Sequence, residues 1–187
     1  MFVARVLFRN TSFKTNAIIS IRSFQTTFPV MAKVGDLLPS VDLFEGSPAN
    51  KINICELTAK KKVIIFGVPG AFTPGCSKTH LPGYVDSADE LKKKLNVNEI
   101  ICISVNDPFV MSAWGKEHSA DGKVRMLADP YGEFVKAMEL TIDLPPLGGI
   151  RSKRFSMIVE DAKVSELNVE SDGTGLSCSL AQNLIKK

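Results

Sequence analysis

Residues 63–76 read VIIFGVPGAFTPGC, an apolar run that passes through a turn to a cysteine. Val63–Val68 has the unbroken hydrophobicity that is typical of a buried strand. Thr73 is a favoured helix N-cap residue, and Pro74 suits the first helical position, where a backbone N–H would have no partner. The stretch therefore predicts a strand, a loop and a helix, with Cys76 in the first helical turn.

A cysteine in the first turn of a helix is more reactive than an ordinary thiol. Unpaired backbone N–H groups and the helix dipole both favour the thiolate there. Lowering a thiol pKa from about 8.5 to about 6 requires roughly 3.4 kcal/mol, whereas a helix terminus supplies roughly 0.3 to 2 kcal/mol. A thiolate at Cys76 therefore needs a cation from elsewhere, because Lys78 in the same turn points to a different face.

Strands and helices alternate along most of the remaining chain. The expected strands are Val63–Val68, Glu99–Val105, Val124–Leu127, Phe155–Glu160 and Lys163–Val169, and the last two form a hairpin. The expected helices are Asp86–Leu95, Pro108–His118, a segment that Asp129–Gly132 opens toward Leu140, and Leu180–Ile185. This order predicts one α/β domain with a central mixed sheet flanked by helices. Residues 144–149 form the one loop-rich stretch.

The net charge of +3 is concentrated at the N-terminus. Residues 1–24 hold four of the 23 basic residues and no acidic one, a composition typical of a mitochondrial transit peptide. The remaining 19 basic residues face 20 acidic ones, so the charge predicts no nucleic-acid or membrane partner. No apolar run approaches the roughly 20 residues that span a bilayer.

We therefore expect a transit peptide at 1–24, a flexible segment at 25–33 and a folded domain at 34–187. An N-terminal arm of the folded protein is the alternative. The expected location is the mitochondrion, and initiation at Met31 would give a cytoplasmic product.

Four cysteines, at positions 55, 76, 102 and 178, have no short paired spacing. The sequence therefore predicts neither a Cys-x-x-Cys zinc site nor the Cys-x-x-Cys motif of a disulfide oxidoreductase. Such sparse, unpaired usage fits a reducing compartment, in which thiols stay reduced unless they do chemistry.

Residues 69–85, PGAFTPGCSKTHLPGYV, resemble the peroxidatic-cysteine motif of peroxiredoxins, in particular of the type 5 (atypical two-cysteine) branch. Five further stretches share the family pattern: VGDLLPSVDLFEG (34–46), SVNDPFVMSAWG (104–115), KVRMLADPYGEF (123–134), KRFSMIVED (153–161) and NVESDGTGLSCSLAQN (168–183). The resemblance covers essentially everything after residue 33. It implies a thioredoxin-like fold and a thiol-dependent peroxidase that needs no metal, haem or flavin cofactor, and it implies a homodimer.

The resemblance also implies the roles of the residues around the cysteine. Cys76 would be the peroxidatic nucleophile, which attacks a hydroperoxide and becomes a sulfenic acid. The Thr73 hydroxyl would bind the thiolate and the peroxide, and Pro69 would shield the sulfur. The backbone N–H groups of Gly75 and Cys76 would bind the peroxide oxygens.

Arg154 stands where the family has an arginine beside the peroxidatic sulfur, so the resemblance implies that it is the missing cation. A guanidinium suits this work because it stays charged and presents several donors to a developing oxyanion. Arg151 and Lys153 are rivals by proximity, and Arg125 is a plausible more distant charge or a surface arginine.

A second thiol must resolve the sulfenic acid. Cys178 lies in the glycine-rich stretch 173–178 and matches the family's resolving position, so the resemblance implies a disulfide between Cys76 and Cys178 that thioredoxin reduces. Cys102 is the alternative, because a related plant-type branch uses a cysteine near there, although its apolar strand favours a buried structural thiol. Cys55 has no family role.

One residue assignment, one loop and one function remain open from the sequence alone. His80, four residues after Cys76, is either a base facing the site or a structural residue at its mouth; a cysteine protease would also need an orienting Asn or Asp, which no motif marks. Residues 144–150 depart from the family's usual loop. The alternative function is a redox relay or peroxide sensor with little bulk turnover.

Overall fold

The computed structural model describes residues 32–186. The expected transit peptide, all but the last two residues of the segment 25–33, and Met31 lie outside the described residues. None of the helices in the described part is long and apolar enough to cross a membrane.

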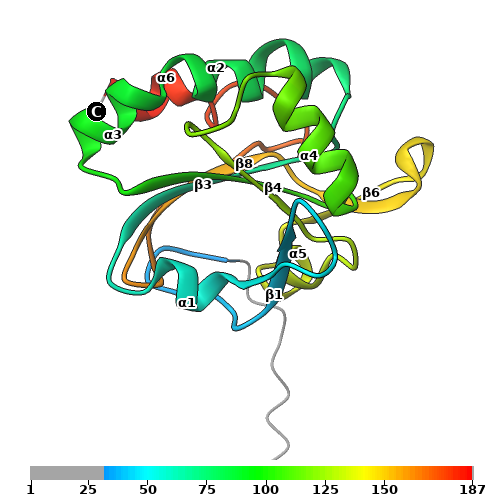
Figure 1. Ribbon diagram of the computed structural model, residues 1–187, viewed down its shortest axis with the longest axis horizontal. Coiled ribbons are helices and arrows are strands. Elements are labelled where there is room, and N and C mark those ends of the chain that lie inside the picture. The colour runs from blue at the N-terminus through cyan, green and yellow to red at the C-terminus, as the bar shows by residue number, and fades with distance from the viewer. Residues whose placement is uncertain (1–31, 187) are drawn as a thin grey trace, which may run out of the picture.

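A mixed sheet of seven strands, in the order β2-β1-β5-β4-β3-β8-β9, organises the fold (Figure 1). Its strands are β1 (Asp42–Glu45), β2 (Lys51–Asn53), β3 (Lys62–Val68), β4 (Glu99–Ser104), β5 (Arg125–Ala128), β8 (Phe155–Glu160) and β9 (Lys163–Val169). β3, β4 and β5 run parallel, and the other neighbours pair antiparallel. The predicted mixed sheet and the predicted closing hairpin are both confirmed.

Helices cover both faces of this sheet. The helices are α1 (Ile54–Thr58), a π-helical turn (Cys76–His80) that continues into α2 (Leu81–Asp86), α3 (Ala88–Leu95), α4 (Pro108–Glu117), α5 (Glu133–Ala137) and α6 (Ala181–Ile185). Figure 1 shows α2, α3, α4 and α6 above the sheet, with α1 and α5 below it. The predicted thioredoxin-like fold class therefore agrees with the layers observed.

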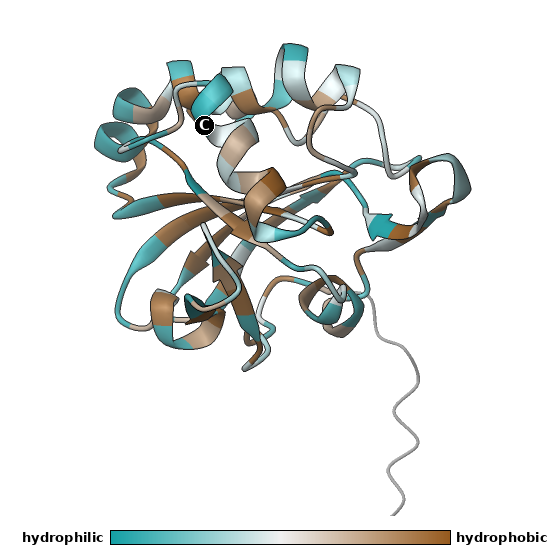
Figure 2. Ribbon diagram, turned by 45° about the vertical axis from the view of Figure 1, so that its right-hand side comes forward, coloured by the Kyte–Doolittle hydropathy of each residue, from teal (hydrophilic) through white to brown (hydrophobic). Residues whose placement is uncertain are grey.

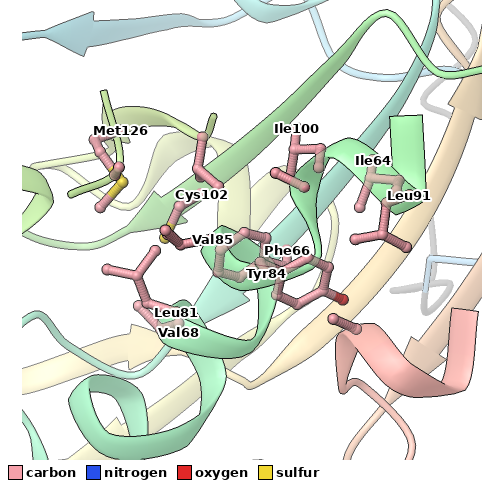
Figure 3. Close-up of a cluster of buried hydrophobic side chains, with 14 of the residues drawn as sticks. Ile64, Phe66, Val68, Leu81, Tyr84, Val85, Leu91, Ile100, Cys102 and Met126 are labelled. Atoms are coloured by element: carbon pink, nitrogen blue, oxygen red, sulfur yellow. The ribbon is translucent and has the colours of Figure 1, made fainter. Parts of the chain in front are cut away.

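Burial on both faces explains why the strands are apolar without alternation. Along β3, Ile64 and Phe66 point into the core beneath α2 and α3, while Val63 and Ile65 point into the core on the side of α1 and α5. Figure 3 shows Phe66 and Tyr84 at the centre of the first core. Figure 2 shows hydrophobic central strands and hydrophilic outer turns of the helices.

Several short elements were missed by the sequence analysis. β1, β2 and α1 hold only three to five residues each, too few for a hydrophobic period to emerge. The stretch 144–149, expected as a loop, contains a 3-10 turn (Pro145–Leu147) that joins β6 (Thr141–Leu144) to β7 (Gly149–Ser152). β6 and β7 form a separate two-stranded hairpin, so the expected loop is its connection at residues 145–148, and the two strands on either side were missed.

Gly67 leaves room for the aromatic side chain that begins β8. A Cβ built on Gly67 would lie 2.1 Å from Cε1 of Phe155, the residue paired with it across β3 and β8. The ring therefore lies directly over the β3 backbone, and it fixes the start of β8.

We expect Gly67→Ala to destabilise the protein by about 1–3 kcal/mol, because overpacking would force Phe155 from its position. Urea denaturation measures the free energy of unfolding. Gly83→Ala is the matched control, since nothing lies within 4 Å of a Cβ there and alanine favours the helix. Equal stability of the two variants would contradict the packing argument.

Candidate active site

The loop after β3 is fixed to the end of β4 before it reaches the cysteine. The Ala71 N–H donates to Asn106 Oδ1 at 3.0 Å, and the Ser104 hydroxyl donates to the same oxygen at 2.7 Å. Phe72 has a φ of 63°. A non-glycine residue in this left-handed region costs on the order of 1–3 kcal/mol. The hydrogen bond from Ala71 to Asn106 stabilises this turn at Phe72, and the turn leads the chain into the helix that carries Cys76.

Thr73 lies at the predicted start of the helix, but its hydroxyl does not cap it. The carbonyl of Thr73 accepts the Ser77 N–H at 2.9 Å, as an N-cap carbonyl does, while the hydroxyl donates to the Gly70 carbonyl at 3.0 Å. Because the hydroxyl proton is used there, its lone pairs remain as acceptors. Pro69 is buried where β3 ends.

Cys76 lies in the first turn of the helix that starts at Pro74, as predicted, and there the helix passes into a π-helical turn, which the sequence did not predict. The Leu81 N–H bonds back to the Cys76 carbonyl, five residues earlier. The Cys76 side chain is fully buried. Such π turns frequently mark functional sites, and this one holds both Cys76 and His80.

The structure places Arg154 against the cysteine. Its Nη1 lies 3.3 Å from Cys76 Sγ, and its Nε donates to the Thr174 carbonyl at 3.0 Å. Arg154 is only 4% exposed, and within residues 32–186 no carboxylate forms an ion pair with it. Its charge is therefore available to a thiolate at Cys76.

Gly75 lets the guanidinium approach the helix. A Cβ at Gly75 would lie 3.2 Å from Arg154 Nη2 and 3.4 Å from Leu176 Cδ1. The missing side chain therefore allows both the cation and the Cys178 segment to pack against the turn that carries Cys76.

His80 is buried behind Arg154 rather than placed at the mouth of the site. Its Nδ1 lies 3.2 Å from Arg154 Nη1, and its Nε2 lies 3.1 Å from the Ser179 carbonyl. Since a carbonyl only accepts, Nε2 carries the proton and Nδ1 accepts from the guanidinium. Burial and the Arg154 charge lower the pKa of His80 to about 3. His80 is therefore a neutral support for Arg154.

Two of the other basic residues considered for this role, Arg151 and Arg125, make their contacts elsewhere. Arg151 donates to the Leu147 carbonyl at 2.8 Å and to the Val105 carbonyl at 2.5 Å, which fastens the β6–β7 hairpin to the segment after β4. Arg125 pairs with Glu45 and Glu99 on the sheet, at 2.7 and 2.8 Å. Arg125 is therefore an arginine on the face of its strand that pairs with two carboxylates, which was the alternative to a role near Cys76.

The two candidate resolving thiols differ in accessibility. Cys102 is fully buried on β4. This burial, and to a smaller extent the neighbouring Cys76, raises the pKa of Cys102 well above its ordinary value. Cys178 is half-buried in the segment between β9 and α6, and its pKa is raised by partial burial and by the Glu170 carboxylate. All four cysteines are free thiols in this structure.

Comparison with known proteins identifies the family. The Redoxin family model matches residues 33–185. Peroxiredoxin-2B from Arabidopsis thaliana is 46% identical over 157 residues, which cover 82% of this chain and 96% of that relative. The chain belongs to the peroxiredoxin family. Such relatives support a thiol-dependent peroxidase activity for it.

Solved structures of peroxiredoxins are similar throughout the described domain. Reduced Prx3 from Vibrio vulnificus in complex with H2O2 has a TM-score of 0.78 and 42% identity, over 83% of this chain and 98% of that one. Peroxiredoxin 5 from Alvinella pompejana has a TM-score of 0.72 and 39% identity, over 85% of this chain and 100% of that one. The relatives thus include both plant peroxiredoxin-2 and peroxiredoxin 5, so they establish the family and leave the type 5 branch a prediction.

Two residues of this peroxiredoxin site escaped the sequence analysis. Tyr84 stacks on Phe66 with ring centroids 4.0 Å apart, and its hydroxyl donates to the Ser179 carbonyl at 2.8 Å. Glu170 is 3% exposed and accepts hydrogen bonds from serines on either side of Cys178. The i+4 spacing from His80 to Tyr84 was the one available signal; Glu170 offered none, because an isolated glutamate is usually exposed.

If Arg154 has its predicted role, Arg154→Gln should slow the reaction of Cys76 with H2O2 by about 10²–10³-fold, because the charge that would stabilise the thiolate and the leaving oxygen is lost. Arg154→Lys should fall between this variant and the wild type, since it keeps the charge but loses the planar fork. Stopped-flow fluorescence of Trp114, whose Nε1 donates to Ser77 Oγ at 3.0 Å, measures the rate. Arg125→Gln is the control; a similar loss in that variant would contradict a specific role for Arg154.

Burial of neutral His80 predicts a pH-dependent stability. An unfolded histidine has a pKa near 6.5, against about 3 here, so the unfolded chain binds more protons between these values and stability falls as pH falls. The free energy of unfolding should drop by roughly 1.5 kcal/mol from pH 6.5 to pH 5. The carboxylates with lowered pKa, Glu99, Glu170 and Asp172, act mainly below this window, because unfolded carboxyl groups titrate near pH 4.

Urea denaturation at several pH values tests this expectation. His80→Gln, which offers one donor and one acceptor without titrating, should abolish the slope between pH 5 and 6.5. His118→Gln, which replaces the other histidine, should retain it. An unchanged slope in His80→Gln would show that His80 is not the group responsible.

Proposed function

We propose that the chain is a thiol peroxidase that reduces H2O2 and alkyl hydroperoxides at Cys76. The single observation that carries the proposal is the 3.3 Å contact between the Arg154 guanidinium and the buried Cys76 sulfur. In the reaction the thiolate attacks one peroxide oxygen, the O–O bond breaks, and the leaving oxygen takes up a proton. The products are the Cys76 sulfenic acid and water or an alcohol.

The residues around Cys76 have separate tasks in this proposal. Arg154 stabilises the negative charge that develops on the leaving oxygen. The Thr73 hydroxyl, whose proton is directed to Gly70, accepts a hydrogen bond from the incoming peroxide. The backbone N–H groups of Gly75 and Cys76 bind the peroxide oxygens, and Pro69 limits access of water to the sulfur. No metal or other cofactor is required by this chemistry.

Cys178 is the proposed resolving thiol, as in the type 5 branch. It reacts with the Cys76 sulfenic acid to form an intrachain disulfide and water, and a thioredoxin dithiol reduces the disulfide. Its half-buried position in a segment outside the sheet supports this role, whereas Cys102 would have to leave the centre of β4. Cys102 remains the rival because plant relatives are among the matches.

A homodimer and a mitochondrial location complete the proposal. Phe72, four residues before Cys76, is 49% exposed, and Phe109, in the first turn of α4, is 62% exposed. Both side chains offer apolar surface for a second copy of the chain. A sedimentation mass equal to that of one chain would exclude the dimer. The composition of residues 1–24 supports import, and the N-terminal sequence of the protein recovered from mitochondria would test it.

Three cysteine variants test the proposed cycle. Cys76→Ser should lose the fast reaction with H2O2, because the nucleophile is gone. Cys178→Ser should keep that reaction and lose turnover with thioredoxin, whereas Cys102→Ser should keep both. Stopped-flow Trp114 fluorescence measures the first step, and a thioredoxin-coupled peroxidase assay measures turnover.

Each alternative has its own signature in the same measurements. A peptide that joins Cys76 to Cys102 by mass spectrometry would overturn the Cys178 assignment. Fast oxidation of Cys76 together with negligible turnover in the thioredoxin assay would favour the redox relay over the peroxidase.

A further inference from the structure

The segment that carries Cys178 is bound to a buried carboxylate. Glu170, the residue after β9, accepts from the Ser177 N–H at 2.8 Å and the Ser177 hydroxyl at 2.5 Å. It also accepts from the Ser179 N–H at 3.0 Å and the Ser179 hydroxyl at 2.7 Å. All four donors belong to the two residues that flank Cys178. The carboxylate therefore holds the backbone on both sides of that thiol.

Glu170 stays ionised despite its burial. Burial alone would raise its pKa, but the hydrogen bonds from Ser177 and Ser179 lower it to about 2. Within residues 32–186 it forms no ion pair with a lysine or arginine. Its charge is thus balanced by the serine donors, and bonds to a charged acceptor are stronger than neutral ones.

The same segment is held from the opposite side by the helix that carries Cys76. The Ser179 carbonyl accepts from both His80 Nε2 at 3.1 Å and the Tyr84 hydroxyl at 2.8 Å. His80 in turn contacts Arg154. The residue after Cys178 is therefore fixed between the end of β9 and the active-site helix.

This fixed position is not the one in which the disulfide forms. Cys76 is fully enclosed beneath Arg154, while Cys178 remains partly at the surface, and both are free thiols. A disulfide requires the two sulfurs to approach to about 2.05 Å. Formation of the disulfide therefore requires movement of the segment 177–179, of the turn that carries Cys76, or of both, and any movement of the segment 177–179 strains its hydrogen bonds to Glu170.

We propose that Glu170 is a positioning residue that acts as a latch: its hydrogen bonds to Ser177 and Ser179 set the rate at which Cys178 reaches oxidised Cys76. The proposal rests on the proposed resolving role of Cys178. The gated step joins the two sulfurs; the S–O bond of the Cys76 sulfenic acid breaks, and its OH leaves as water with the Cys178 proton.

The latch has two consequences for Cys178. While it is closed, partial burial and the neighbouring Glu170 carboxylate raise the pKa of the Cys178 thiol and keep it protonated. When the segment 177–179 moves away from Glu170, the Cys178 thiol can approach Cys76 and is no longer beside the negative charge of the carboxylate. Slow opening also prolongs the life of the sulfenic acid, which a second peroxide oxidises to the sulfinic acid.

The test is the rate of disulfide formation in variants that weaken the latch. The double variant Ser177→Ala/Ser179→Ala removes the two hydroxyl donors and leaves the carboxylate in place. We expect disulfide formation after one equivalent of H2O2 to become about tenfold faster, because two hydrogen bonds to a charged group no longer oppose opening. The preceding oxidation of Cys76 should stay within about twofold of wild type, and the sulfinic acid yield at high peroxide should fall.

Glu170→Gln separates the effect of the hydrogen bonds to the segment 177–179 from the effect of the negative charge. The amide keeps one oxygen for the backbone donors but removes the charge, so it should also resolve faster than wild type. Glu160→Gln is the matched control, because that glutamate lies on the exposed side of β8 and pairs with Lys62. Rapid quenching with a thiol-alkylating reagent, followed by mass spectrometry, counts the sulfenic, sulfinic and disulfide forms.

An unaltered or slower disulfide step in both variants would overturn the latch. Amide exchange of the wild-type protein by NMR provides a test that needs no variant: the Ser177 and Ser179 N–H groups should be protected in the reduced form and exchange faster in the disulfide form. Equal protection in the two forms would also overturn it.

Cys178→Ser distinguishes failure of the latch from failure of the proposed cycle. If that variant still forms an intrachain disulfide with Cys76, the resolving role of Cys178 is wrong, and the latch is wrong with it. If it forms none, while the latch variants resolve at the wild-type rate, the latch alone is overturned.

Discussion

The contact between Arg154 Nη1 and Cys76 Sγ is the interaction on which the rest of the site depends. A buried sulfur would favour its neutral form, because desolvation penalises the thiolate. A helix terminus by itself supplies too little free energy to reverse this preference. The buried Arg154 guanidinium, which has no carboxylate ion-pair partner among residues 32–186, lies where the proposed thiolate needs a positive charge.

The sheet brings this pair together across almost eighty residues of sequence. β8 runs antiparallel to β3, and Gly67 pairs with Phe155. The residue before β8 therefore lies beside the end of β3, where the loop toward Cys76 begins. Because Phe155 packs over a glycine, the start of β8 is fixed, and with it the direction from which Arg154 enters the site.

Neutral groups then hold the cation without cancelling it. Arg154 donates to the Thr174 carbonyl, and its Nη1 lies beside both Cys76 and the unprotonated Nδ1 of His80. The carboxylate of Glu170 is nearby, yet its oxygens are used by serine donors. The site thus keeps one strong positive charge at the sulfur, and the groups that support it also secure the segment of the second thiol.

The sequence by itself determined the strand-loop-helix around Cys76, the closing hairpin and the need for a distant cation, because apolar runs, turn residues and helix caps act over a few neighbours. It missed the π-helical turn, the short β6–β7 hairpin and the burial of His80. The family resemblance pointed to Arg154, but local spacing left Arg151 and Lys153 as rivals, and only the tertiary structure shows Arg154 against the sulfur. Only the tertiary structure shows that Glu170 holds the segment of Cys178. Those choices depend on strand register and on which donors meet in a buried volume, and neither quantity is encoded in local spacing.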